Sequence, residues 1–173
     1  MESRKAELLP VEYFHVVFTL PEEMARIAFQ NKRLVYGLLF RAASETLLEV
    51  AADPKHLGAD IGFLGVLHTW GQNLLHHPHV HCVVPGGGLS PDRSRWVSCL
   101  PGFFLPVRVL SRVFRGKFLA HLRKAFQQGE LKFRGELKPW GEPTRFAQVV
   151  AAAYRMEWVV HAKPPWGGPE RRC

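Results

Sequence analysis

Residues 79–84 read HVHCVV, and this segment constrains the fold more than any other because its alternate positions differ in chemistry. Successive side chains of a β-strand point to opposite faces of the sheet. The two valines and the cysteine at the even positions would therefore share one face, and His79 and His81 would share the other. The segment predicts a sheet whose apolar face packs against helices and whose histidine face is open.

The order of the predicted elements gives a topology. Strands are predicted over 13–20, 60–70, 79–86 and 158–163, with a short extra strand at 96–99. Helices are predicted from Pro21, over 32–52, over 106–128 and over 144–155, with a loop over 129–143. This order, β-α-β-β-α-β, is typical of the α+β ferredoxin-like or RRM-like fold, in which one antiparallel sheet has helices on one face. The sequence shows no internal repeat and no long linker, so we expect one domain over 1–173.

Composition narrows the class of protein. The chain has 173 residues, of which 47% are hydrophobic, and this predicts a globular domain with a substantial core. No apolar run reaches the ~18 residues of a membrane span, and the start, MESRKAELLP, lacks the apolar stretch of a signal peptide. We therefore expect a cytoplasmic protein without a membrane partner. The net charge of +8 favours an anionic partner, of which nucleic acid is the commonest.

His79 and His81 make the open face a candidate metal site. Two imidazoles at positions i and i+2 of a strand are close enough to bind one divalent cation. The preceding strand would form a hairpin with them, and if Trp70 pairs with His79, then His68 lies opposite His81 and offers a third ligand. Gln72 is the alternative third ligand.

The residues around this pair have other expected places. His76 and His77 are expected in the turn of the hairpin, where they could contact phosphate. A structural zinc site that uses Cys82 is disfavoured, because Cys82 points away from the histidines and could not complete a tetrahedral site with them. We expect Cys82 in the core as a small hydrophobe. Simple solvation of clustered histidines is the remaining alternative to a metal site.

Basic and aromatic side chains suggest contacts with DNA. An open sheet face that carries a metal beside a basic helix suggests phosphoryl transfer. Tyr13 and Trp70 could stack on unpaired bases, or they could belong to the core. Several Arg and Lys residues of the helix predicted over 106–128 lie outside its apolar Phe and Leu face. They could bind phosphate, or they could simply form a solvated face. Those that we single out are Arg108, Arg112, Arg115 and Lys117.

Longer segments of the chain carry a resemblance to a known family. The following five are similar, in this order, to the two-tyrosine rolling-circle transposases of bacterial insertion sequences, a branch of the HUH endonucleases: LPVEYFHVVFTLPEE, LLFRAASETLLEVAADPKHLGA, GVLHTWGQNLLHHPHVHCVVPGGGLS, PGFFLPVRVLSRVFRGKFL and AKPPWGGPE. The resemblance implies nicking and strand transfer during DNA transposition, with single-stranded or hairpin DNA as the partner. It also implies that His79 and His81 bind Mg²⁺ or Mn²⁺, and that His68 stands at the position of the third ligand.

The resemblance also sets an expectation about activity. In this family a cysteine-rich zinc-binding segment usually comes first, and we expect this chain to lack it, since nothing like it precedes LPVEYF. The nucleophilic tyrosines of the family lie on a helix after the KPP-aromatic-GGPE segment, which this chain reaches just before Cys173. We expect a fragment without the nucleophile, incomplete at the C-terminus, since Tyr13, Tyr36 and Tyr154 fit no such helix. It would bind metal and DNA without covalent strand transfer. The alternative is a non-catalytic nucleic-acid-binding module with metal-free histidines.

Overall fold

A four-stranded antiparallel sheet forms the centre of the molecule. The computed structural model describes residues 9–70 and 76–166 of the chain. The four strands are β1 (Tyr13–Thr19), β2 (Leu64–Trp70), β3 (His76–Pro85) and β6 (Val160–Trp166). Their order across the sheet is β2-β3-β1-β6, and every neighbouring pair is antiparallel. This is the predicted α+β fold with the split βαβ arrangement, so the fold class read from the sequence is confirmed.

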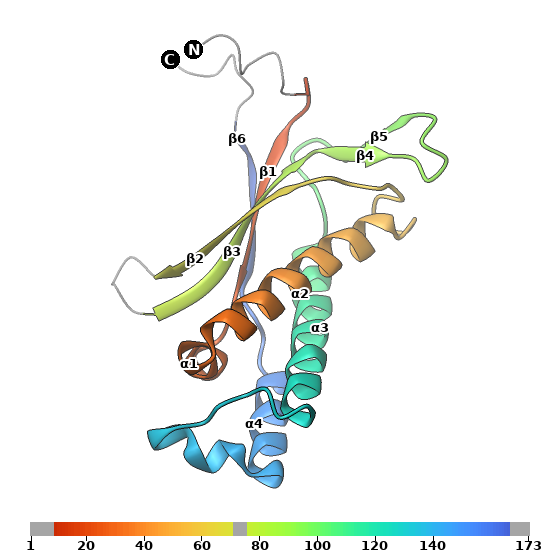
Figure 1. Ribbon diagram of the computed structural model, residues 1–173. Coiled ribbons are helices and arrows are strands. Elements are labelled where there is room, and N and C mark those ends of the chain that lie inside the picture. The colour runs from red at the N-terminus through yellow and green to blue at the C-terminus, as the bar shows by residue number, and fades with distance from the viewer. Residues whose placement is uncertain (1–8, 71–75, 167–173) are drawn as a thin grey trace.

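Helices cover one face of this sheet. They are α1 (Glu22–Gln30), α2 (Lys32–Ala52), α3 (Val107–Gln127) and α4 (Pro143–Arg155). The two long helices, α2 and α3, lie together on the same side of the sheet (Figure 1). The predicted loop over 129–143 is only partly a loop, because it contains the 3₁₀-helix η2 (Gly135–Gly141). None of the helices in the described ranges is long and apolar enough to cross a bilayer.

The core lies between the sheet and these helices. On the two central strands, six side chains at alternate positions are at most 2% exposed; these are Phe14, Val16, Phe18, Val80, Cys82 and Val84. Cys82 therefore has the core position expected of it. Phe114 of α3 packs on Phe18, with ring centroids 5.0 Å apart. The alternation predicted for HVHCVV thus places α3 on the face of the sheet opposite the histidines.

A small second sheet explains where the prediction of strand 60–70 was wrong. Its strands are β4 (Gly87–Leu89) and β5 (Trp96–Ser98), and Leu89 also forms an isolated bridge with Asp60. Of the predicted strand over 60–70, only the part from Leu64 onward therefore belongs to the main sheet. Gly88 permits this close approach, because a Cβ atom at that position would lie 2.4 Å from the carbonyl oxygen of Asp60.

Candidate metal centre

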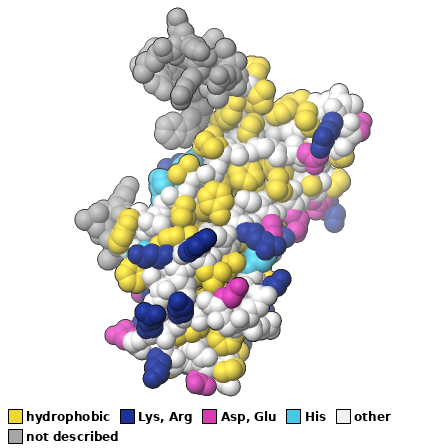
Figure 2. Space-filling view, in the orientation of Figure 1, with side chains coloured by type: hydrophobic (Ala, Val, Ile, Leu, Met, Phe, Trp, Pro, Cys, Tyr) yellow, Lys and Arg dark blue, Asp and Glu magenta, His cyan; other side chains and the backbone are white. Residues whose placement is uncertain are grey.

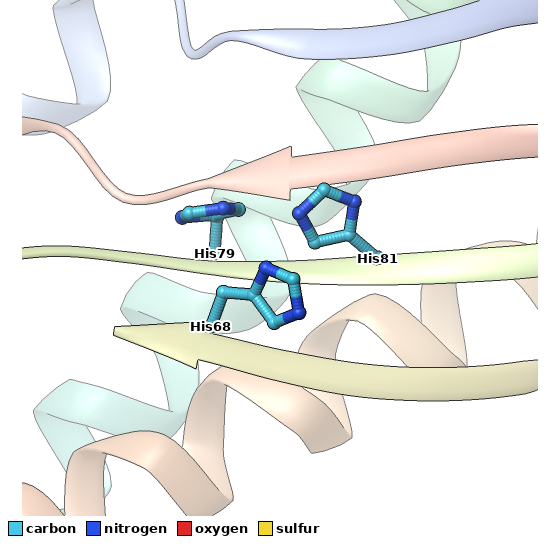
Figure 3. A group of neighbouring side chains, drawn as sticks. All are labelled: His68, His79 and His81. Carbon is cyan, nitrogen blue, oxygen red and sulfur yellow. The ribbon is translucent and has the colours of Figure 1, made fainter. Parts of the chain in front are cut away.

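Three histidines meet on the open face of the sheet. His68 comes from β2, and His79 and His81 come from β3. One nitrogen of each ring lies within 4.8 Å of the others. The rings point toward one another from the two neighbouring strands (Figure 3). Metal–nitrogen bonds to imidazole are about 2.0–2.1 Å long, so small ring rotations would bring all three nitrogens onto one ion.

The strand register that brings His68 into this group differs from the predicted one. His68 lies opposite His79, and Val66 lies opposite His81, so the predicted pairing of Trp70 with His79 is wrong by two residues. A shift by two leaves each side chain on its own face, which is why His68 still joins the group. β3 also begins earlier than predicted, so His76 and His77 lie in the strand and not in a turn. Gln72 lies outside the described residues.

The hydrogen bond of His79 defines its protonation. Its Nδ1 donates to the carbonyl oxygen of His77, at 2.5 Å. A carbonyl oxygen can only accept, so Nδ1 carries a proton, and in the neutral ring Nε2 is the nitrogen with the free lone pair. Histidines that bind metals commonly hold their second ring nitrogen in this way. His79 therefore offers Nε2 as a ligand atom.

A fourth histidine, His15 of β1, holds the ring of His81. Nε2 of His15 and Nδ1 of His81 are 2.6 Å apart and share a hydrogen bond, and the two rings stack at 11°. Nε2 of His81 is buried and has no partner among the described residues. This leaves Nε2 as the ligand atom of His81. The sequence carried a signal for His15, because alternation along β1 puts it on the polar face.

The environment keeps the half-buried imidazoles of His15 and His81 neutral. Burial is the main reason that the pKa of His81 falls to about 4. Any proton on the neighbouring imidazoles of His68, His79 and His15 would act in the same direction, as does the charge of Lys163. Burial is also the largest cause that lowers the pKa of His15. Both rings are therefore neutral at pH 7, and neutral imidazole is the form that binds metal.

The stability of the metal-free protein should fall as the pH drops from about 6.5 to about 4. His81 has an ordinary pKa of about 6.5 in the unfolded chain, and the folded chain lowers this pKa to about 4. Between these values the unfolded chain binds more protons, so acid favours unfolding. Urea denaturation of chelator-treated protein across this interval measures the effect. His81→Asn should reduce the slope, and a wild-type midpoint that does not change with pH would contradict the assignment.

The four basic residues predicted to bind nucleic acid lie away from the histidines. Arg108 and Arg112 are exposed and line a cavity of about 250 Å³ between α3 and the start of β6. Arg115 donates to the carbonyl oxygen of Met156 at 2.6 Å. Lys117 forms an ion pair with Glu49 at 2.5 Å. Because α3 is on the covered face, the predicted adjacency of these cations to the histidines is wrong. That these four residues contact DNA stays a prediction. Any DNA that they contact would lie away from the histidine face of the sheet.

The three tyrosines of the chain lie apart from the histidine group. Tyr13 is on the open face but pairs with Pro85, four positions along β3 from His81. Tyr36 shares a hydrogen bond with His76 at 2.8 Å, on the helix side of the sheet. Tyr154 is 53% exposed on α4, under the guanidinium of Arg115. None of these arrangements aims a phenol at the three ligand nitrogens.

The fold is similar to that of solved relaxase structures. Conjugative relaxase TrwC in complex with oriT DNA, in its metal-free and its metal-bound structures, is similar with a TM-score of 0.52 and 15% identity. The match covers 64% of this chain and 43% or 42% of those chains. TrwC complexed with a 27-mer DNA comprising the recognition hairpin and the cleavage site gives a TM-score of 0.51 at 14% identity, over 79% of this chain and 54% of that one. The chain therefore shares the fold of these TrwC structures.

Sequence comparison identifies the family. The family model Y2_Tnp, described as "Putative transposase", matches residues 62–172. "Putative transposase y4qJ" of Sinorhizobium fredii (strain NBRC 101917 / NGR234) is 65% identical over 171 residues, which cover 99% of this chain and 43% of that protein. "Transposase for insertion sequence element IS801" of Pseudomonas savastanoi pv. phaseolicola is 44% identical over 121 residues, covering 62% of this chain and 28% of that protein. The chain belongs to this transposase family, and it spans less than half the length of these relatives.

Proposed function

We propose that this chain is the DNA- and metal-binding core of a transposase that nicks and transfers single strands. The family and the relaxase-like fold support DNA processing during transposition. The partner is single-stranded or hairpin DNA, and the cofactor is a divalent cation, Mg²⁺ or Mn²⁺. The described tyrosines supply no nucleophile at the site, so the chain by itself binds its substrate without forming a covalent link.

The observation that carries this proposal is the group of three histidines on an open sheet face. His68, His79 and His81 converge within 4.8 Å and would hold the cation. A bound divalent ion would polarise the scissile phosphate and offset the charge that develops on it. The all-nitrogen donor set fits a transition metal better than Mg²⁺, which prefers oxygen ligands. We therefore expect Mn²⁺ to bind more tightly than Mg²⁺.

Lys163 supplies a positive charge beside the group of three histidines. It lies opposite His15 on β6, on the open face, and its side chain is exposed. Its ammonium group is close enough to contribute to the lowered pKa of His81. A phosphate that approaches the histidines therefore meets a cation that can donate hydrogen bonds to its oxygens. We assign Lys163 the role of orienting the phosphate.

His15→Ala should weaken Mn²⁺ binding by about 10- to 100-fold, which is the usual cost of losing an outer-shell partner of a ligating histidine. The substitution frees the ring of His81 to rotate, because it removes the hydrogen bond at 2.6 Å. Calorimetry with Mn²⁺ measures the effect. His56→Ala is the matched control, since His56 is exposed in a turn after α2. Equal affinities of the two variants would show that His15 does not position the site.

A denaturing gel tests whether the chain cuts DNA. Labelled single-stranded DNA is incubated with the protein and Mn²⁺, beside the His79→Ala/His81→Ala variant. We expect neither cleavage products nor a covalent protein–DNA band from either protein. A metal-dependent covalent band that the variant loses would contradict the absence of a nucleophile, and Tyr→Phe substitution at Tyr13, Tyr36 and Tyr154 would then identify the residue.

The alternative function, a nucleic-acid-binding module with metal-free histidines, makes a different prediction for chelation. In that case DNA binding survives EDTA without any loss of affinity and weakens steeply with added salt, as expected of phosphate contacts alone. The proposed metal centre instead predicts that Mn²⁺ increases the affinity for DNA. Comparing DNA affinity with Mn²⁺ and with EDTA at one salt concentration separates the two functions.

A further inference from the structure

A row of three aromatic rings crosses the end of the sheet, close to the candidate metal centre. His76, the first residue of β3, lies between Phe29 of α1 and Trp70 of β2. Its ring centroid is 5.2 Å from that of Phe29 and 5.9 Å from that of Trp70. We call Phe29, His76 and Trp70 the aromatic row. Its two outer rings are solvent-accessible, with exposures of 53% for Phe29 and 54% for Trp70.

The row is held in place by the strands and by α2. The register between β2 and β3 shifts by one residue between His68 and Trp70, which puts Trp70 opposite His76. A shift by one turns a side chain to the other face of a sheet, so Trp70 does not follow His68 onto the histidine face. The hydroxyl of Tyr36 shares a hydrogen bond of 2.8 Å with Nε2 of His76. The central ring of the row is thereby fixed.

Positive charge accompanies the row. The ammonium nitrogen of Lys32 lies 4.9 Å from the ring centroid of Phe29. In Figure 2, Lys and Arg side chains lie beside hydrophobic surface over α1 and the ends of β2 and β3. Exposed rings next to cations are the features by which proteins bind unpaired nucleic acid, because the rings stack on bases and the cations neutralise phosphates.

A cleft connects the row with the side of the sheet that carries the histidine group. The cleft has a volume of about 910 Å³. Phe29 and His76 line it, and so do Thr19 and His77. Thr19 pairs with His79, and His77 precedes His79 by two residues on the same strand. Since a strand rises about 3.3 Å per residue, the backbone of His76 lies about 10 Å from that of His79.

We propose that the aromatic row and this cleft bind the unpaired nucleotides that flank the phosphate at the histidine group. This inference rests on the proposed function, because it takes the same DNA strand as its ligand. A strand that leaves the histidine group around the end of the sheet enters the cleft beside Thr19 and His77. Its bases then stack on Phe29 and Trp70, and Lys32 lies next to the phosphates between them.

The charges within the cleft favour a base over a phosphate there. Its walls carry three carboxylates as well as two guanidinium groups, and Arg26 is already paired with Glu136 at 3.2 Å. The carboxylates are Glu22, Glu136 and Glu157. These would repel a phosphate, whereas an uncharged base has no such penalty and gains contact with the apolar lining. A duplex, whose bases are already stacked, gains nothing from exposed rings.

Fluorescence anisotropy with a labelled oligo(dT), in EDTA, tests the row independently of the metal. Phe29→Ala and Trp70→Ala should each weaken binding of the single strand by about 5- to 150-fold, the range expected for the loss of one base stack. The affinity of these variants for a duplex of the same length should equal that of the wild type. Phe29→Tyr and Trp70→Phe, which keep an aromatic ring, should retain most of the affinity.

Trp96→Ala is the matched control, because Trp96 is a partly exposed aromatic residue of β5, in the small sheet. It should bind the single strand like the wild type. The proposal is overturned if Phe29→Ala/Trp70→Ala binds as tightly as Trp96→Ala, or if it loses affinity for duplex and single strand alike. Mn²⁺ calorimetry on the same variants keeps the two proposals separate: failure of Mn²⁺ binding in the wild type refutes the metal centre, while the anisotropy series still decides the row.

Discussion

Replacement of both His79 and His81 by alanine should abolish Mn²⁺ binding measured by calorimetry. The two residues supply two of the three convergent nitrogens, and only His68 would remain. Loss of an outer-shell partner alone costs about 10- to 100-fold in metal affinity, so loss of two ligands should exceed this range. Because His79 and His81 are half-buried on the open face, the variant should keep its fold.

Circular dichroism and thermal unfolding of the double variant establish that the fold is intact. His56→Ala again serves as the control, since it removes an exposed histidine of the turn after α2 that is not part of the group. It should bind Mn²⁺ like the wild type. An unchanged Mn²⁺ affinity in a folded His79→Ala/His81→Ala protein would show that the ion binds elsewhere, and the assignment of the metal centre would be wrong.

Phe18→Ala should destabilise the protein by about 3–5 kcal/mol, the usual cost of truncating a buried phenylalanine. Phe18 is fully buried on β1, opposite Val80 of β3, and packs on Phe114. The cavity would lie directly beneath the strands that carry the histidines. Since domains of this kind have about 5–15 kcal/mol of stability in total, the variant would lose a large fraction of it.

Urea denaturation followed by circular dichroism measures this loss. Leu48→Ala is the control, because Leu48 is 46% exposed on α2 and alanine favours a helix. It should change the free energy of unfolding by less than about 0.5 kcal/mol. If Phe18→Ala cost no more than Leu48→Ala, the packing of α3 against β1 described here would be incorrect.

The fold could be predicted because its main signals are local. The alternation along YFHVVFT and HVHCVV separates covered from open positions, and the order of strands and helices then leaves few topologies. One boundary that was not predicted is the start of β2. Asp60 bonds to Leu89 in the small sheet, a contact between residues distant in sequence that no periodicity indicates.

The candidate site could be predicted in part. Strand alternation placed His79 and His81 on one face, and the hairpin brought His68 to them although the predicted register was wrong. His15 was missed as their neighbour because it joins the group through the pairing of β1 with β3, which depends on the order of strands in the sheet. The prediction that α3 lies beside the histidines failed for a similar reason, since the side of the sheet on which a helix packs is a property of the tertiary fold.

The aromatic row shows the limit of turn prediction. The segment GQNLLHHP was predicted as a turn, and proline lacks the donor that a sheet needs, yet β3 begins at His76 and includes Pro78. Only with His76 in the strand do Phe29 and Trp70 come to lie on either side of it. Phe29 precedes Trp70 by 41 residues, and no motif joins it to Trp70 and His76.

The central claim, a metal centre that receives a DNA phosphate, is tested most directly by the coupling between the two ligands. The measurement is the affinity for Mn²⁺ by calorimetry, without DNA and with saturating single-stranded oligonucleotide. If His68, His79 and His81 hold the ion where the phosphate binds, DNA should increase Mn²⁺ affinity by about 5- to 150-fold, the range typical of coupled sites, and Mn²⁺ should increase DNA affinity by the same factor. Equal Mn²⁺ affinities with and without DNA would contradict the account.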